Sequence, residues 1–196
     1  MLKHSGQLIN AYNYATTVDR SVSALHTLQE VTDNSIQYDS SETGIIVDAF
    51  KNRVITMDTG TGIPMDIFCE NYHTFHNTPK DTTGISMAGL GSKLFYKLSD
   101  MRITLTRHKG ELYYSIWSFA SLESFENPEI EYLDMDSLPD LLKEHQDIVD
   151  RFVALGVDST FTILPNVKSW GKHRSSSKKF YNALRDHYED RYGHFL

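Results

Sequence analysis

The first regular pattern in the chain is a stripe of apolar residues at helical spacing. Apolar side chains recur at steps of four and three in the N-terminal part: Val18, Val22, Leu25, Leu28 and Val31. These steps place the side chains on one face of an amphipathic helix. We therefore expect a helix from Val18 to about Gln37, preceded by an N-terminal arm at residues 1–17.

Short apolar runs bounded by turn residues predict strands farther along. The expected strands are 44–50, 53–57, 102–107, 111–118 and 160–164. Turns fall at Lys51-Asn52 and Lys109-Gly110, and Pro165 closes the last strand. Two short helices are expected between them, one from Pro64 to about Tyr72 and one from Ser92 to Leu98, because proline suits a first helical turn and glycines precede Ser92.

Charge is distributed unevenly along the second half of the chain. Residues 121–150 carry ten acids and one lysine, whereas residues 159–185 carry six basic residues and no acid. We expect an acidic, solvated insertion at about 121–157 and a basic helical segment at 166–196. The alternative for the basic side chains is contact with DNA. They are Lys168, Lys172, Arg174, Lys178 and Lys179.

Length and composition narrow the class of protein. The 196 residues, 40% of them apolar, suit a single domain with one core, and the net charge of -7 does not favour nucleic acid or anionic membrane over the whole surface. The single cysteine, Cys69, excludes an internal disulfide, and no apolar run reaches the roughly 18 residues that span a bilayer. We expect a cytoplasmic protein without a membrane partner.

The N-terminal helix carries a polar triplet, Glu30, Asp33 and Asn34. Four-residue spacing places Glu30 and Asn34 on one face, about one turn apart. A carboxylate can deprotonate a water, and an amide oxygen can coordinate magnesium, which prefers hard oxygen ligands. Taken alone, the triplet is weak evidence, because most such triplets belong to an exposed helix surface.

A glycine turn follows the second expected strand, in the sequence Asp58-Thr-Gly60-Thr-Gly62-Ile63. Glycine permits close backbone approach or positive φ. An aspartate held beside such a turn can accept a hydrogen bond from the exocyclic amine of adenine, whereas guanine offers a carbonyl at that position. The alternative is an ordinary tight turn, in which Asp and Gly are common.

A second glycine-rich stretch leads into the helix expected at Ser92. It reads Gly84-Ile-Ser-Met-Ala-Gly89-Leu90-Gly91-Ser92-Lys93. Backbone N–H groups at a helix start can bind phosphate oxygens, and Lys93 can add charge. The stretch is not a Walker A loop, since Leu90 follows Gly89 where that loop has lysine. The earlier glycine turn is not a dinucleotide fingerprint, since Met65 stands at the position of the third glycine. A flexible connection and a solvated lysine are the alternatives.

The three segments in this order resemble the N box and two glycine boxes of the GHKL superfamily, the Bergerat-fold ATPases. Thr160, in Ser159-Thr-Phe-Thr162, resembles the late threonine that supports the adenine-binding aspartate in that family. The resemblance covers roughly residues 18–165. It implies an α+β fold, a two-layer α/β sandwich whose mixed, mostly antiparallel sheet carries helices on one face.

The resemblance also implies roles for individual residues. Glu30 would be the catalytic base, Asn34 the magnesium ligand, and Asp58 the adenine reader. The residues implied to bind ATP are Asp33, Asn34, Asp58, Gly60, Gly62, Ile63, Gly89, Leu90, Gly91, Ser92, Lys93 and Thr160. The segment 73–92 would be a mobile lid over the phosphates, and the cofactors would be ATP and Mg²⁺.

The expected function is a slow magnesium-dependent ATPase that switches conformation or pairs as a homodimer on binding ATP. A glutamate in the N box resembles the hydrolysing gyrase, MutL, heat-shock-chaperone and MORC branches. Gyrase and MutL supply a further lysine from a downstream domain, so we expect such a domain or a partner protein. The alternatives are a histidine or anti-sigma-type kinase and a nucleotide-binding module without turnover.

Overall fold

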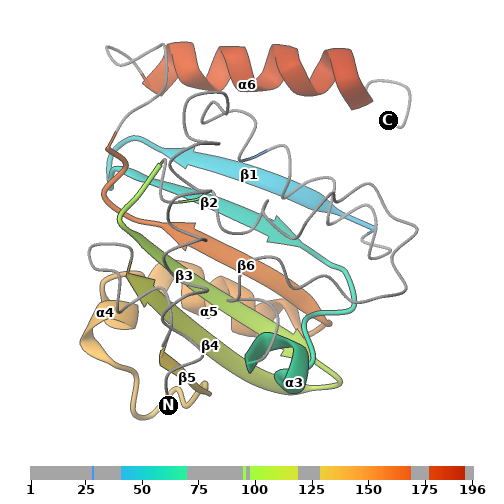
Figure 1. Ribbon diagram of the computed structural model, residues 1–196, viewed down its shortest axis with the longest axis vertical. Helices are drawn as coiled ribbons and strands as arrows, with labels where there is room; N and C mark the ends of the chain where they lie inside the picture. The colour runs from blue at the N-terminus through green and yellow to red at the C-terminus, as the bar shows by residue number, and fades with distance from the viewer. Residues whose placement is uncertain are drawn as a thin grey trace, which may run out of the picture.

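The fold is built on a sheet of six strands. The computed structural model describes Leu28, Phe95 and the residues 41–69, 98–118, 129–168 and 177–192. The strands are β1 (Thr43–Asp48), β2 (Arg53–Asp58), β3 (Met101–His108), β4 (Glu111–Ser118), β5 (Glu129–Tyr132) and β6 (Ser159–Leu164). Their order is β1-β2-β6-β3-β4-β5, and every neighbouring pair is antiparallel (Figure 1).

Two local hairpins follow from their turn residues. Lys109 and Gly110 both have positive φ, 51° and 84°, as a two-residue hairpin turn that matches strand twist requires. At the β1–β2 turn, Asn52 has φ 48°, and Asp48 Oδ1 accepts the Lys51 N–H at 3.0 Å. Both turns predicted from the sequence are confirmed.

Helices lie on both sides of this sheet. They are α3 (Met65–Ile67), α4 (Asp140–Lys143), α5 (Gln146–Leu155) and α6 (Ser177–Tyr192). In Figure 1, α4 and α5 lie behind the sheet, and α6 runs alongside the β1 edge. Gly156, with φ 74°, ends α5 in the left-handed conformation that glycine adopts most easily.

Alternation along the strands divides the core into two clusters. On one face, here called the α5 face, Ile148, Val149 and Phe152 of α5 pack on strand residues that include Ile55, Ile103, Leu105, Phe161 and Ile163. The other face carries a second cluster, which joins Val54, Leu164 and Trp117 to Leu28 and Leu184. Burial of each such side chain contributes about 1.5–3 kcal/mol, so each face has its own source of stability.

Three expectations about the architecture need correction. The described sheet is wholly antiparallel rather than mixed, and helical residues pack on both faces rather than on one. The acidic insertion is not simply solvated, because α5 lies inside it and three of its residues are buried in the core. The ten acids of residues 121–150 concealed the apolar face of this helix.

The N-terminal arm and most of the expected helix 18–37 lie outside the described residues. Leu28 is helical and fully buried. The helix expected at 92–98 is described only at Phe95, which has 3₁₀ geometry, and at Leu98. Among the described helices, none combines the length and the apolar character needed to cross a membrane.

Candidate functional site

The face of the sheet opposite α5 carries two rows of polar side chains, and we call it the threonine face. The first row, the aspartate row, crosses four strands through Asp58, Thr160, Thr106 and Tyr113. The second, the threonine row, crosses the same strands through Thr56, Thr162, Thr104 and Ser115. Every residue of the threonine row is at most 3% exposed, and Thr104 and Ser115 are fully buried at 0%.

Asp58 and Thr160 are directly paired across β2 and β6. Opposite residues of an antiparallel pair project to the same face, with Cβ atoms about 5 Å apart. Asp58 is half-buried and accepts the Gly60 N–H through Oδ1 at 3.1 Å. The structure thus brings together an acid and a threonine that are separated by about a hundred residues, as the resemblance implied.

The glycine turn is fixed to β3 by close backbone contact. Gly62 has φ 66°, and a Cβ atom at this position would lie 1.8 Å from the Arg107 carbonyl oxygen. His108 Nδ1 lies 2.7 Å from the Thr61 carbonyl oxygen, which can only accept, so this nitrogen carries the proton. Glycine is required at position 62 both for its φ and for the space.

Thr106 joins the turn to the centre of the sheet. Its Oγ1 accepts the Ile63 N–H at 2.8 Å and donates to the Ser159 carbonyl oxygen at 3.3 Å. The side chain is fully buried. Since Thr106 also pairs with Thr160, β3, β6 and the turn that follows Asp58 form one hydrogen-bonded unit.

Aromatic side chains close the far end of the aspartate row. Tyr113 packs against Phe68 and Tyr132, with ring centroids 6.4 Å and 5.7 Å away. Burial, together with the neighbouring Glu111 carboxylate, raises the pKa of Tyr113 to about 12. Tyr113 therefore remains a neutral hydroxyl at physiological pH. Phe68, just after α3, is buried against Tyr113, and this contact holds the segment after the glycine turn against the threonine face.

Leu28 locates part of the N-terminal helix on the same face. It is fully buried in the cluster that contains Val54 and Leu164. Among the other implied site residues, those of the N box and the second glycine box lie outside the described residues. These are Glu30, Asp33, Asn34, Gly89, Leu90, Gly91, Ser92 and Lys93.

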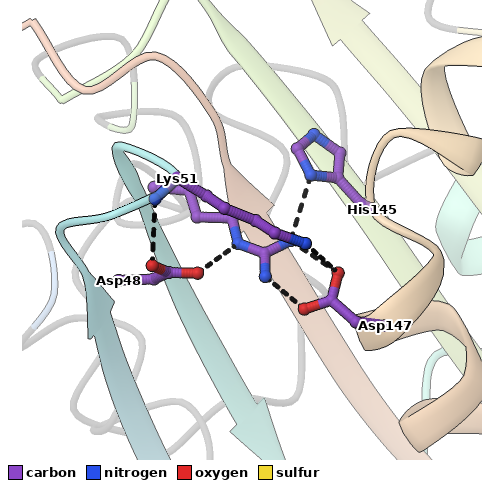
Figure 2. A network of polar contacts seen from close by, with 5 residues as sticks. Asp48, Lys51, His145 and Asp147 are labelled. Atoms are coloured by element: carbon purple, nitrogen blue, oxygen red, sulfur yellow. Dashed lines mark hydrogen bonds and ion pairs between the residues drawn. The ribbon is translucent and has the colours of Figure 1, made fainter.

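Sequence reasoning missed a charged cluster on the α5 face, which Figure 2 shows. Arg53 is 2% exposed, and its guanidinium binds Asp147 and, at 2.9 Å, Asp48. Its NH1 lies 3.2 Å from His145 Nδ1, which must accept because a guanidinium only donates. Lys51 Nζ also contacts Asp147 at 2.9 Å.

This cluster shifts the titration of its members. The hydrogen bond from Arg53 holds the pKa of Asp147 well below its usual range. Burial and the Arg53 charge lower the pKa of His145. Arg53 begins one of the strands predicted from the sequence and Asp48 lies within another, but His145 and Asp147, at the start of α5, lie more than ninety positions from Arg53. The cluster ties the β1–β2 hairpin to α5.

A pocket of about 260 Å³ lies on the α5 face, near the end of β2. It is lined by Gly44, Met57 and Phe161 from the strands and by Arg151 and Leu155 from α5. Met57 and Phe161 belong to the core cluster of the α5 face. Although Asp58 also borders this pocket, the space lies on the side of the sheet opposite the aspartate row.

The basic segment is partly neutralised by acids. Lys168 forms an ion pair with Asp100, and Arg185 pairs with Asp186 and, at 3.6 Å, with Glu189. Lys178 and Lys179, at the start of α6, are exposed. The described residues contain no group of three His, Cys, Asp or Glu side chains able to hold a metal.

Comparison with protein-family models and with characterised proteins gives no match to this chain.

Proposed function

We propose that the threonine face binds ATP, with Asp58 accepting a hydrogen bond from the exocyclic amine of adenine and Thr160 beside it. The observation that carries this proposal is the direct pairing of Asp58 with Thr160 next to a glycine turn fixed on β3. A carboxylate accepts hydrogen bonds and cannot donate them, so it favours the amine of adenine over the carbonyl of guanine. Polar rows on a largely buried sheet face also suit a polar ligand.

The position of Leu28 supports a contribution from the N box. Asn34 follows Leu28 by six residues, a rise of about 9 Å in a helix. Asp58 follows Val54, which shares the cluster of Leu28, by four residues, about 13 Å in a strand. The proposal therefore requires that the predicted helix runs in the direction of β2 from Leu28 onward, so that Glu30 and Asn34 lie toward the aspartate row.

The proposed reaction is slow hydrolysis of ATP with magnesium. Glu30 takes a proton from a water molecule, whose oxygen attacks the γ-phosphorus while the bond to the β–γ bridging oxygen breaks, giving ADP and phosphate. Asn34 would hold the magnesium ion, which would supply positive charge beside the phosphates, and Lys93 with the N–H groups around Gly89 and Gly91 would bind the phosphate oxygens. These roles rest on the resemblance described above.

Phosphate release and ATP binding, measured on the same variants, test this function. In Glu30→Ala, release of phosphate should fall about 100-fold or more while ATP affinity changes little, because a general base acts only in the reaction. Glu144→Ala, an exposed change of the same kind, is the control. Wild-type release that is unchanged in Glu30→Ala would remove the hydrolysis step and leave a binding module.

We further propose that bound ATP favours pairing of two chains, which hydrolysis then releases. Mass measurements over a range of protein concentrations, with and without a nonhydrolysable ATP analogue, test this step. A monomer under both conditions would contradict it. Transfer of labelled phosphate to a partner protein, in place of free phosphate, would favour the kinase alternative.

A further inference from the structure

The two neighbouring threonines of β3 on the threonine face differ in their hydrogen bonds. Thr104 and Thr106 are both fully buried and are two residues apart, so they project to the same face. Thr106 Oγ1 has two protein partners, the Ile63 N–H and the Ser159 carbonyl oxygen. Within the part of the chain that the structure describes, Thr104 Oγ1 is buried without any hydrogen-bond partner.

A buried hydroxyl without a partner is unusual in a folded protein. Its neighbours in the threonine row do not supply one, although Thr104 lies directly between Thr162 and Ser115 on the adjacent strands. An apolar residue of the same shape would avoid the cost of burying the hydroxyl. Because the surrounding face is polar and lies beside the aspartate row, a water molecule held by a ligand can provide the missing partner.

We propose that Thr104 is a positioning residue for the nucleotide: its hydroxyl holds an ordered water that hydrogen-bonds the adenine base. This inference rests on the proposed ATP site. Thr104 lies two strands across from Asp58 and two residues along the sheet, a separation of about 12 Å. A base bound at Asp58 lies between the two, and a bridging water spans the remaining gap to Thr104. Asp58 then binds the exocyclic amine of the base directly, and Thr104 hydrogen-bonds another part of the base through the water molecule.

The test is Thr104→Val, which keeps the shape of the side chain and removes the hydroxyl. Its melting temperature without nucleotide should equal or exceed that of the wild type, because no protein hydrogen bond is lost. Its dissociation constant for magnesium-ATP, measured by calorimetry, should rise about fivefold, the effect of one lost water-mediated hydrogen bond. Thr104→Ser, which restores the hydroxyl, should recover most of the affinity.

Thr106→Val is the matched comparison, on the same strand and face and equally buried. It removes two hydrogen bonds within the protein, so its melting temperature should fall by about 5 °C. A comparable fall in Thr104→Val would show that the hydroxyl has a structural partner and would overturn the inference.

The remaining outcomes separate this inference from the proposed function. If Asp58→Asn weakens ATP binding and Thr104→Val does not, the ATP site stands and the role of Thr104 is wrong. If the wild type shows no heat with magnesium-ATP, the proposed function itself fails. Either result contradicts the inference, the first alone and the second together with the function on which it rests.

Discussion

Asp58 and Thr160 face each other across the β2–β6 pair, on the same side of the sheet and next to a glycine turn fixed on β3. The pairing depends on β6 inserting between β2 and β3, although β6 is the last strand in the chain. An ordinary tight turn after a strand does not require a threonine on the neighbouring strand opposite its aspartate. The pairing is therefore the observation on which the proposed nucleotide site chiefly rests.

Gly62→Ala should destabilise the protein more than Gly110→Ala. Both glycines have positive φ, but a Cβ at Gly62 meets the Arg107 carbonyl oxygen, whereas a Cβ at Gly110 has no atom within 4 Å. We expect a loss of about 1 kcal/mol at Gly110 from backbone strain, and about 2–4 kcal/mol at Gly62 from strain and overlap together. Urea unfolding measures both. Equal losses would show that the turn is not held against β3.

Asp147→Asn should weaken the attachment of α5 to the β1–β2 hairpin. Arg53 is buried and would keep only Asp48 as a carboxylate partner among the described residues. Because Asp147 is 46% exposed, solvent screening limits the expected loss to about 1–2 kcal/mol of unfolding free energy at pH 7. Asp140→Asn, at a side chain that is 98% exposed, is the control and should change little.

The same carboxylate predicts the acid dependence of stability. Its pKa is lowered in the folded protein, so its contribution is complete above the unfolded value near 3.8 and is lost as the pH falls below it. In Asp147→Asn this part of the acid dependence should be absent. An unchanged acid unfolding curve would contradict the role given to the Arg53 cluster.

His145 predicts a second, separate pH dependence. Burial and the Arg53 charge lower its pKa in the folded protein below the ordinary value of 6.5. Below pH 6.5 the unfolded chain binds a proton that the folded protein does not, so stability falls as the pH decreases, by at most about 1.4 kcal/mol per unit. His145→Gln keeps an acceptor for Arg53 and should flatten the curve between pH 7 and 5. Parallel curves for the two proteins would refute this.

The strands of the two hairpins could be predicted because a short turn between neighbouring strands leaves a signal in the sequence. The hairpin of β3 and β4 and that of β1 and β2 were predicted to within about two residues, since Lys109-Gly110 and Lys51-Asn52 mark their turns. The placement of β6 was not predictable in this way, because its neighbours are far away in the chain. It was the family resemblance that brought Thr160 beside Asp58.

Other parts of the structure were obscured by composition. Ten acids in residues 121–150 indicated a solvated insertion and drew attention away from Ile148, Val149 and Phe152, whose spacing is that of a buried helix face. β5 was missed because it is short and alternates acids with Ile130 and Tyr132. The Arg53 cluster depends on contacts across more than ninety residues, which no local pattern records.

Calorimetric titration of magnesium-ATP and magnesium-GTP into the wild type and Asp58→Asn tests the adenine site most directly. We predict measurable heat with ATP, much less with GTP, and a loss of ATP affinity of about 10- to 100-fold in Asp58→Asn, as expected for a hydrogen bond to a charged group. Asp150→Asn, at an exposed side chain of α5, is the charge-matched control and should bind as the wild type does. No heat with ATP, or equal affinity in Asp58→Asn, would contradict the account.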